Sequence, residues 1–300
     1  MKKFLVQVIL FFFVVICVDV CLGYTFEYMK ANSHSGKFKK LNHAYAVDAD
    51  ILILGSSRAL HHIIPEILVD SLGMSCYNCG WNASSIVPMY SIYSAIIKKS
   101  KPKIVIYDVY SACDIFDDKI VDKVLNMKPY YSHSVVHKIY DDVLPNEKLK
   151  MTSMLYRYNS EMEAVLSGYL KTATIKDSTI WGYEPFYKEL NYEPESYVIQ
   201  HLVNKEDPTK LAYLRKLIES TRQNKILLCF CVSPWYKCST DEDYSSLKKL
   251  CKEYNVPLLN HLTDSVFNDK KLFADPAHLN DKGARIYTRT IAHELQPILN

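Results

Sequence analysis

The chain has 300 residues, which is enough for one sizeable α/β domain with an insertion or for two small domains. Its composition, 49% hydrophobic and 23% charged, is that of an ordinary globular protein. The formal net charge is +3, with acids and bases interspersed and no long basic run, which argues against a nucleic-acid partner.

The N-terminus holds an apolar segment long enough to cross a bilayer. Lys2 and Lys3 precede a run from Phe4 to Leu22 that is apolar except for Gln7 and Asp19. At 1.5 Å rise per residue a helix over this run reaches about 28 Å, close to one membrane span. The two lysines predict that the short end stays in the cytoplasm, which places the rest of the chain outside it. A cleaved signal peptide is the alternative, although no A-x-A-like site follows the run.

From residue 49 onward, short apolar runs alternate with amphipathic stretches. Five runs have the form of buried strands: Asp50–Leu54, Met74–Tyr77, Lys103–Val109, Ile226–Val232 and Val256–Leu259. Helices are predicted between and after them, over Pro65–Leu72, Ser84–Lys99, Asp241–Tyr254 and Asp281–Leu295. This alternation predicts βαβ units and a doubly wound, flavodoxin-like parallel sheet of five strands in a three-layer αβα arrangement.

The alternation stops between the third and fourth strands. Residues 111–224 are mostly helical or irregular, with Met151–Leu170 the best helix, and they hold eleven of the 23 tyrosines. Aromatic faces can stack on sugar rings, but tyrosines also pack helical caps with the hydroxyl in water, and we favour the packing role. The predicted organisation has three parts: 1–23 a membrane anchor or signal segment, 24–48 a polar connector, and 49–300 a globular domain with the insertion 111–224.

The nine cysteines show no disulfide or metal framework. Cys76 and Cys79 form a C-x-x-C pair, but no second ligand pair has convincing spacing. We expect most of the cysteines to be small core residues, and no metal or other cofactor is predicted.

Three polar segments are expected to meet at the carboxyl edge of the sheet, where ligands bind in such folds. They are Gly55-Ser56-Ser57 after the first strand, Asn78-Cys79-Gly80 after the second, and Asp275-Pro276-Ala277-His278 before the last helix. A serine becomes a nucleophile when a base takes its proton and a third group orients that base. Backbone N–H groups of Ser57 and Gly80 could hold the oxyanion.

This arrangement resembles the SGNH/GDSL hydrolase superfamily, in particular its exported branch with a GSSR-type first block. The resemblance implies that Ser57 is the nucleophile and that Ser56 stands where the family has Asp. It maps the second-block glycine onto Gly80 and the closing D-x-x-H block onto Asp275 and His278.

The resemblance covers about residues 50–110 and 226–298, and it has one gap. The family's third block carries an Asn that donates to the oxyanion, whereas the third strand here ends Tyr107-Asp108-Val109. Asn82 is the one candidate substitute near Gly80. Loss of one oxyanion donor costs about 10²-fold in rate if nothing replaces it.

Other polar residues near these blocks have simpler interpretations. Arg58 is expected at the surface or holding an anion, and His61 and His62 are expected on a solvated helix start. His133 and His137 have i, i+4 spacing but no acidic residue between them that could act as a base, so we expect a solvated helix face.

The resemblance implies an extracytoplasmic serine esterase that removes acyl groups, with acetyl the leading expectation, from a glycan or another envelope molecule. The alternative is an O-acyltransferase for a cell-surface polysaccharide, loaded by an integral-membrane acyl donor. A third reading is a non-catalytic binding protein on the same fold, since fold alone does not decide activity.

Overall fold

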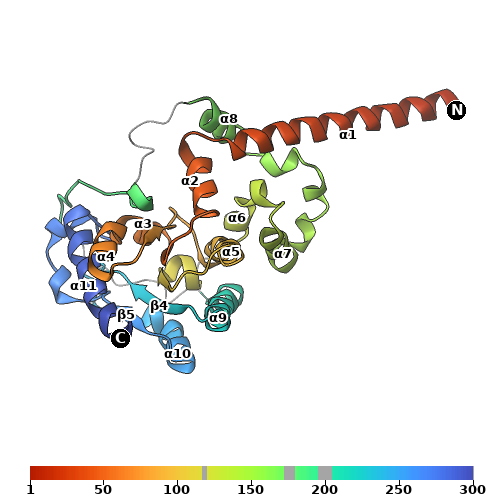
Figure 1. Ribbon diagram of the computed structural model, residues 1–300. Helices are drawn as coiled ribbons and strands as arrows, with labels where there is room; N and C mark the ends of the chain where they lie inside the picture. The colour runs from red at the N-terminus through yellow and green to blue at the C-terminus, as the bar shows by residue number, and fades with distance from the viewer. Residues whose placement is uncertain (117–119, 172–179, 195–204, 300) are drawn as a thin grey trace. The chain divides into compact units, whose positions relative to one another are not determined.

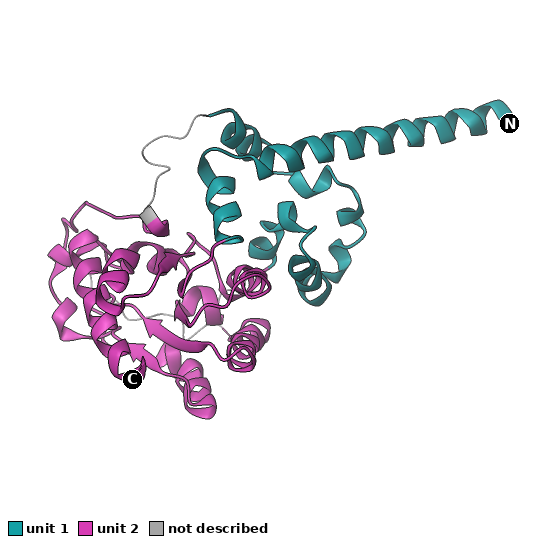
Figure 2. Cartoon of the chain, viewed as in Figure 1, with its two compact units in different colours: residues 1–46, 121–178 teal, residues 47–120, 179–300 magenta. Residues whose placement is uncertain are grey.

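The computed structural model describes residues 1–116, 120–171, 180–194 and 205–299. The chain divides into two compact units (Figure 2). Unit 1 consists of residues 1–46 and 121–178, and unit 2 consists of residues 47–120 and 179–300. Only residues 121–178 of the insertion expected over 111–224 thus lie outside the unit that contains the sheet. They form a unit together with the N-terminal residues 1–46.

Unit 2 is built on a parallel sheet with the strand order β2-β1-β3-β4-β5. The strands are β1 (Ile51–Gly55), β2 (Cys76–Asn78), β3 (Ile104–Asp108), β4 (Leu227–Val232) and β5 (Leu258–Asn260). Every residue of β1 and β3 is buried, which explains why both appear as unbroken apolar runs in the sequence. The order is that of flavodoxin-like folds, so the predicted fold class is confirmed.

Helices flank this sheet (Figure 1). They are α3 (Ser57–His62), α4 (Pro65–Leu72), α5 (Ile86–Ile96), α9 (Pro208–Gln223), α10 (Ser245–Tyr254) and α11 (Asp281–Leu299). Shorter helical turns are η1 (Ala112–Phe116), η7 (Ile180–Gly182), η9 (Glu242–Tyr244), η10 (Ser265–Phe267) and η11 (Lys270–Leu272). Helix α9 lies in the stretch expected as insertion, yet it belongs to unit 2, and the Asp207 side chain caps its first turn by accepting from Thr209 N–H at 2.8 Å.

A short antiparallel pair that the sequence did not predict precedes the last helix. Strand β6 (Phe273–Asp275) pairs with β7 (His278–Leu279) in a two-stranded sheet. Because the pair reverses the chain over two residues, it holds the two ends of the D-x-x-H block side by side.

Unit 1 is helical. It contains α1 (Lys2–Ala31), α2 (Gly36–Ala44), most of α6 (Ile120–Leu125), α7 (Ser134–Val143), α8 (Met162–Leu170), and the turns η2 (Lys128–Tyr130), η3 (Pro145–Glu147), η4 (Lys150–Thr152) and η5 (Tyr156–Tyr158). The stretch 24–48, expected as a connector, holds the end of α1 and the whole of α2.

The single helix expected over Met151–Leu170 is wrong, because that stretch breaks into η4, η5 and α8. The Asp19 carboxylate of α1 accepts the backbone N–H groups of Met154 and Leu155, which the helix would otherwise use. Ser160 then adopts a left-handed conformation with φ 68°, which ends any helix before α8.

The part of α1 that precedes Asp19 is largely exposed. Apart from the partly buried Val8, its large apolar side chains from Phe4 to Val18 are exposed, and its most apolar 18-residue window has a mean hydropathy of 2.9. The helix is therefore long and apolar enough to cross a membrane, a property that a signal sequence shares.

Candidate active site

The chain turns from β1 straight into α3 at Gly55, and only glycine fits there. Gly55 has φ +143°, and an added Cβ would lie 2.6 Å from the Asp108 carbonyl oxygen and 2.9 Å from Ala59 Cβ. The tight turn makes Ser56 the N-cap of α3 and Ser57 its first residue. Ser56 is buried, and its hydroxyl has no hydrogen-bond partner among the described residues, whereas Ser57 is partly exposed.

Ser57, His278 and Asp275 form a continuous hydrogen-bonded chain. Ser57 Oγ lies 2.8 Å from His278 Nε2. His278 Nδ1 lies 2.9 Å from Asp275 Oδ1 and 3.1 Å from Oδ2. With Nδ1–H donating to the carboxylate, Nε2 is left to accept the serine proton, which is the arrangement that activates a serine.

The Asp275 carboxylate is held in place by the backbone of its own turn. Its Oδ1 also accepts the N–H groups of Ala277 and His278, both at 3.0 Å. Burial raises the pKa of Asp275, but the hydrogen bond and charge of His278 together with the two backbone N–H groups outweigh it, so the pKa lies below its ordinary value. The group is therefore an anion at neutral pH and can stabilise an imidazolium.

The two expected oxyanion donors differ in their environment. The Ser57 N–H lies in the first turn of α3, where no intrahelical acceptor exists. The Gly80 N–H donates to Asn78 Oδ1 at 2.9 Å and is engaged within its own turn. An added Cβ at Gly80 would lie 2.6 Å from Leu60 N, so the second block packs directly against the backbone of α3.

Asn78, which received no role from the sequence, joins β2 to α3. It is 2% exposed, and its Nδ2 donates to the carbonyl oxygens of Ala59 at 2.7 Å and Ile63 at 2.9 Å. Because its Oδ1 accepts from Gly80, all of its hydrogen-bonding groups act on the helix that carries Ser57 or on the glycine beside it.

His61 and His62 are not on a solvated helix start, as we expected from the sequence, but buried beside the site. The local sequence did not reveal this, since the residues that cover them are far away in the chain. His61 stacks on Phe186 with 3.9 Å between ring centroids, and its centroid lies 6.0 Å from that of His278. Phe186 comes from the stretch expected as insertion, which here contributes to the wall around His278.

The protonation state of His61 determines the orientation of the Asn82 side-chain amide. His61 Nδ1–H donates to the Glu184 carbonyl oxygen at 2.6 Å. Burial lowers the pKa of His61, so the ring is neutral near pH 7 and Nε2 carries no proton. The atom that lies 3.1 Å from Nε2 is Asn82 Oδ1. Because an unprotonated Nε2 cannot donate to an oxygen, we expect the Asn82 amide to turn over and present its N–H to the ring. The candidate substitute for the third-block Asn is thus fixed near the site by His61.

His62 supports the backbone of the D-x-x-H block. Its Nε2 accepts the Leu279 N–H at 3.0 Å, next to His278 in the chain. Burial, reinforced by the positive charge of Arg58, lowers the pKa of His62 far below its usual range, so the ring stays neutral. A neutral ring is what the accepting Nε2 requires.

Arg58 is not at the surface but 1% exposed. Its guanidinium donates to the carbonyl oxygen of Ser233, and Nε and Nη1 have no hydrogen-bond partner among the described residues. Asp108, which ends β3, accepts from the Ser233 hydroxyl, and burial raises its pKa to about 6 against the opposing charge of Arg58. The third-block position therefore holds a buried carboxyl under the electrostatic influence of a buried cation.

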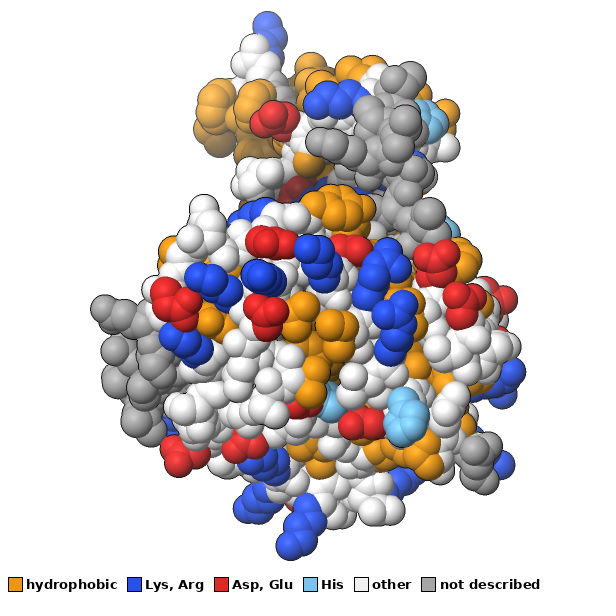
Figure 3. Space-filling model, turned by 90° about the vertical axis from the view of Figure 1, so that its left-hand side faces the viewer, with side chains coloured by type: hydrophobic (Ala, Val, Ile, Leu, Met, Phe, Trp, Pro, Cys, Tyr) orange, Lys and Arg blue, Asp and Glu red, His pale blue; other side chains and the backbone are white. Residues whose placement is uncertain are grey.

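The cysteines of the C-x-x-C pair are core residues. Cys76 and Cys79 are buried, and burial raises the pKa of the Cys79 thiol to about 12 and that of Cys76 well above its usual value. Within the described residues no group of His, Cys, Asp and Glu side chains has the geometry of a metal site. Figure 3 shows Lys and Arg side chains interspersed with Asp and Glu on the face that it draws.

Comparisons with known proteins add similarity in fold. No protein-family model matches the chain, and no curated protein matches it. Among solved structures, the chain is similar to a psychrotrophic esterase from a Pseudoalteromonas species, with 11% identity, a TM-score of 0.43, and 83% of this chain and 98% of that chain covered. It is similar to a lipase/acylhydrolase from Enterococcus faecalis, with 10% identity, a TM-score of 0.40, and 82% and 94% covered. An acetyl xylan esterase matches with 14% identity, a TM-score of 0.40, and 82% and 99% covered. Because each TM-score is below 0.5, the activity of this chain is argued from the geometry of its site.

Proposed function

We propose that this protein is a serine esterase of the SGNH type, with Ser57 as nucleophile, His278 as general base and Asp275 as its orienting anion. The observation that carries this proposal is the unbroken chain of hydrogen bonds from Ser57 Oγ through the His278 ring to Asp275. It lies at the carboxyl edge of a parallel sheet, where α/β folds bind their ligands.

In the reaction, Ser57 Oγ attacks the acyl carbon of an ester, and His278 Nε2 takes the hydroxyl proton. The Ser57 N–H, in the first turn of α3, is our candidate donor to the oxyanion. The imidazolium then gives its proton to the departing alcohol, which leaves Ser57 acylated. A water molecule, deprotonated by the same nitrogen, releases the carboxylic acid and restores the serine.

The expected substrate is an acylated glycan or another envelope molecule, with acetyl as the leading acyl group. This follows from the resemblance to exported SGNH hydrolases and from an anchor that holds Ser57 outside the cytoplasm. The orientation of the anchor rests on Lys2 and Lys3, which favour the cytoplasmic side.

Contacts within unit 1 support an uncleaved anchor over a cleaved signal peptide. Asp19 binds two backbone N–H groups of the segment after η4, and Gly23 packs so closely on Met154 that an added Cβ would lie 2.3 Å from Met154 Cβ. Cleavage after Leu22 would strip Asp19 from unit 1 and leave these N–H groups unpaired.

The test uses the full-length chain in detergent micelles, treated with an active-site serine phosphonate and examined by intact mass and peptide mapping. We expect one adduct, on Ser57, which is lost in Ser57→Ala and His278→Ala but retained in Ser56→Ala. An adduct on Ser56, or no adduct on the wild-type chain, contradicts the proposal.

Turnover of p-nitrophenyl acetate then separates the functions. Steady hydrolysis in water indicates an esterase, whereas a burst followed by slow release that an added glycan accelerates indicates an acyltransferase. A non-catalytic binding protein shows neither, and its Ser57→Ala form behaves like the wild type.

A further inference from the structure

The contacts of α1 with the rest of unit 1 limit how deeply α1 can enter a membrane. Gly23 lies 20 residues after Lys3, and 20 residues of α-helix rise about 30 Å, which is the thickness of the hydrocarbon core of a bilayer. Asp19 lies only about 24 Å from Lys3 along the same axis. With the lysines at one membrane surface, both residues therefore reach the opposite surface or lie just inside it.

The partner of both residues is the same short segment of unit 1. Asp19 accepts from Met154 N–H at 2.8 Å, from Leu155 N–H at 3.1 Å and from the Ser153 hydroxyl. The close approach of Gly23 to Met154 adds a backbone contact. A carboxylate near the hydrocarbon boundary is costly unless such donors accompany it. The segment that satisfies Asp19 must therefore lie at the membrane interface itself.

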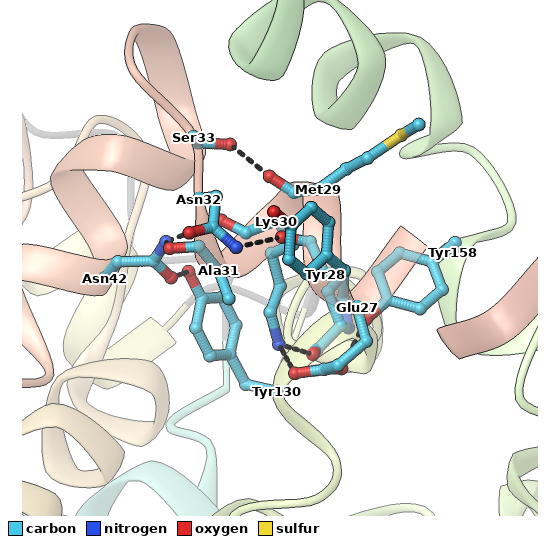
Figure 4. Close-up of polar contacts among 11 residues, drawn as sticks. Glu27, Tyr28, Met29, Lys30, Ala31, Asn32, Ser33, Asn42, Tyr130 and Tyr158 are labelled. Atoms are coloured by element: carbon cyan, nitrogen blue, oxygen red, sulfur yellow. Dashed lines mark hydrogen bonds and ion pairs between the residues drawn. The ribbon is translucent and has the colours of Figure 1, made fainter. Parts of the chain in front are cut away.

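A second set of contacts joins α1 to the rest of unit 1 (Figure 4). Lys30, which is 2% exposed, donates to Glu27 and to the Pro129 carbonyl oxygen, each at 2.6 Å. The other carboxylate oxygen of Glu27 accepts from the Tyr158 hydroxyl. Because these polar groups of α1, η2 and η5 bond to one another, the rest of unit 1 cannot slide along the helix away from the membrane.

The loop that leads into this segment carries an apolar side chain that the described residues leave uncovered. Leu149 is 80% exposed, and Lys148 and Lys150 flank it in the chain. Each lysine has its own acidic partner, Asp141 at 2.7 Å and Glu147 at 2.7 Å. An exposed leucine between lysines fits a lipid interface, where the apolar group enters and the ammonium groups stay in the headgroup layer.

We propose that residues 149–155 form a membrane-docking loop, which seats unit 1 on the bilayer beside α1 with Leu149 inserted among the lipids. This inference rests on the proposed anchor but not on the esterase activity. Since both lysines are paired, the attraction is chiefly apolar rather than electrostatic. Docking would hold unit 1 at a fixed distance from the bilayer, whereas α1 alone would only attach it to the membrane.

The test places a tryptophan at this position in the full-length chain, as Leu149→Trp, reconstituted in phosphatidylcholine liposomes. Its matched control is Leu170→Trp, because Leu170 is also exposed in unit 1, at 67%, but lies at the end of α8. There Gly168 accepts the His34 N–H, beyond the C-terminal end of α1 and thus farther from the membrane. Both leucines are exposed, so neither substitution disturbs the core.

Emission is compared between ordinary liposomes and liposomes with bromine atoms on the acyl chains near the headgroups, after subtraction of the wild-type signal. An inserted side chain lies within about 5–10 Å of the headgroup boundary, so we expect quenching of the added signal at position 149 by about twofold and little at 170. Equal quenching at both positions contradicts the docking proposal but not the anchor. Absence of quenching at position 149, in protein that floats with the liposomes, has the same meaning. Protein that fails to float overturns the anchor and the docking together, whatever its phosphonate labelling shows.

Discussion

Asn78 offers the sharpest test of how the fold holds the nucleophile. The residue is buried and makes three hydrogen bonds, two as a donor to the Ala59 and Ile63 carbonyl oxygens and one as an acceptor from Gly80. Ala59 and Ile63 belong to α3 or to the residue just after it, and α3 begins at Ser57. Substitution of Asn78 thus acts on stability and on the placement of Ser57 at once.

Two substitutions separate these effects. Asn78→Ala removes three buried hydrogen bonds at about 1 kcal/mol each, so we expect the free energy of unfolding to fall by about 3 kcal/mol. Asn78→Asp has the same shape and keeps the acceptor for Gly80, but a carboxylate cannot donate to the two carbonyl oxygens 2.7 and 2.9 Å away. A buried carboxylate facing two oxygens is costlier, at about 3–5 kcal/mol, because it leaves a charge without a partner.

The stability of only one of the two variants should therefore depend on pH. The new carboxyl of Asn78→Asp has a raised pKa in the folded state, since burial and the two carbonyls favour the protonated form, which can donate one hydrogen bond. Its stability is then highest at acid pH and falls as pH rises through that pKa, whereas the loss in Asn78→Ala is nearly independent of pH. Urea unfolding at pH 5 and pH 8 measures this difference.

Activity provides the second readout. A displacement of Ser57 by about 1 Å costs about 10²-fold in the rate of p-nitrophenyl acetate hydrolysis, so we expect a loss of that order in Asn78→Asp at pH 8. Asn268→Asp, at an exposed position of unit 2, is the control and should match the wild type. Wild-type stability and rate in Asn78→Asp at pH 8 would refute the role given to Asn78.

Three further predictions concern single contacts. Gly80→Ala places a Cβ 2.6 Å from Leu60 N, so α3 must shift, and we expect kcat for p-nitrophenyl acetate to fall by about 10²-fold with the protein still folded by circular dichroism. The pKa of His62 in the folded state lies below its value in the unfolded state, so the wild-type chain has its full stability above about pH 6.5. On acidification the free energy of unfolding should fall by up to about 1.4 kcal/mol per pH unit. Urea unfolding of His62→Gln, whose side-chain oxygen can still accept from the Leu279 N–H, should show a smaller slope. Lys30→Met leaves Glu27 and the Pro129 carbonyl without their buried donor, so thermal unfolding of unit 1 should show a loss of about 1–3 kcal/mol, and an unchanged unfolding temperature would contradict the locking role of Lys30.

Local patterns in the sequence predicted the elements of unit 2 well. Continuous apolar runs such as those of β1 and β3 are characteristic of strands buried on both faces, and their alternation with helices leaves few topologies other than a parallel sheet. The residues expected at its carboxyl edge do lie together, since Ser57 and His278 are within hydrogen-bond distance. The apolar run after Lys3 likewise predicted a long helix, because hydrophobicity and length are local properties.

Only the tertiary structure decided the surroundings of that site and the makeup of unit 1. Burial of Arg58, His61 and His62 depends on residues far away in the chain, such as Ser233 and Phe186, and no short-range pattern records such contacts. The same holds in unit 1, where a carboxylate in the membrane run interrupts a helix expected more than a hundred residues later. A polar group in an apolar run is energetically acceptable when donors from a distant segment satisfy it, and the sequence does not specify that segment until the chain has folded.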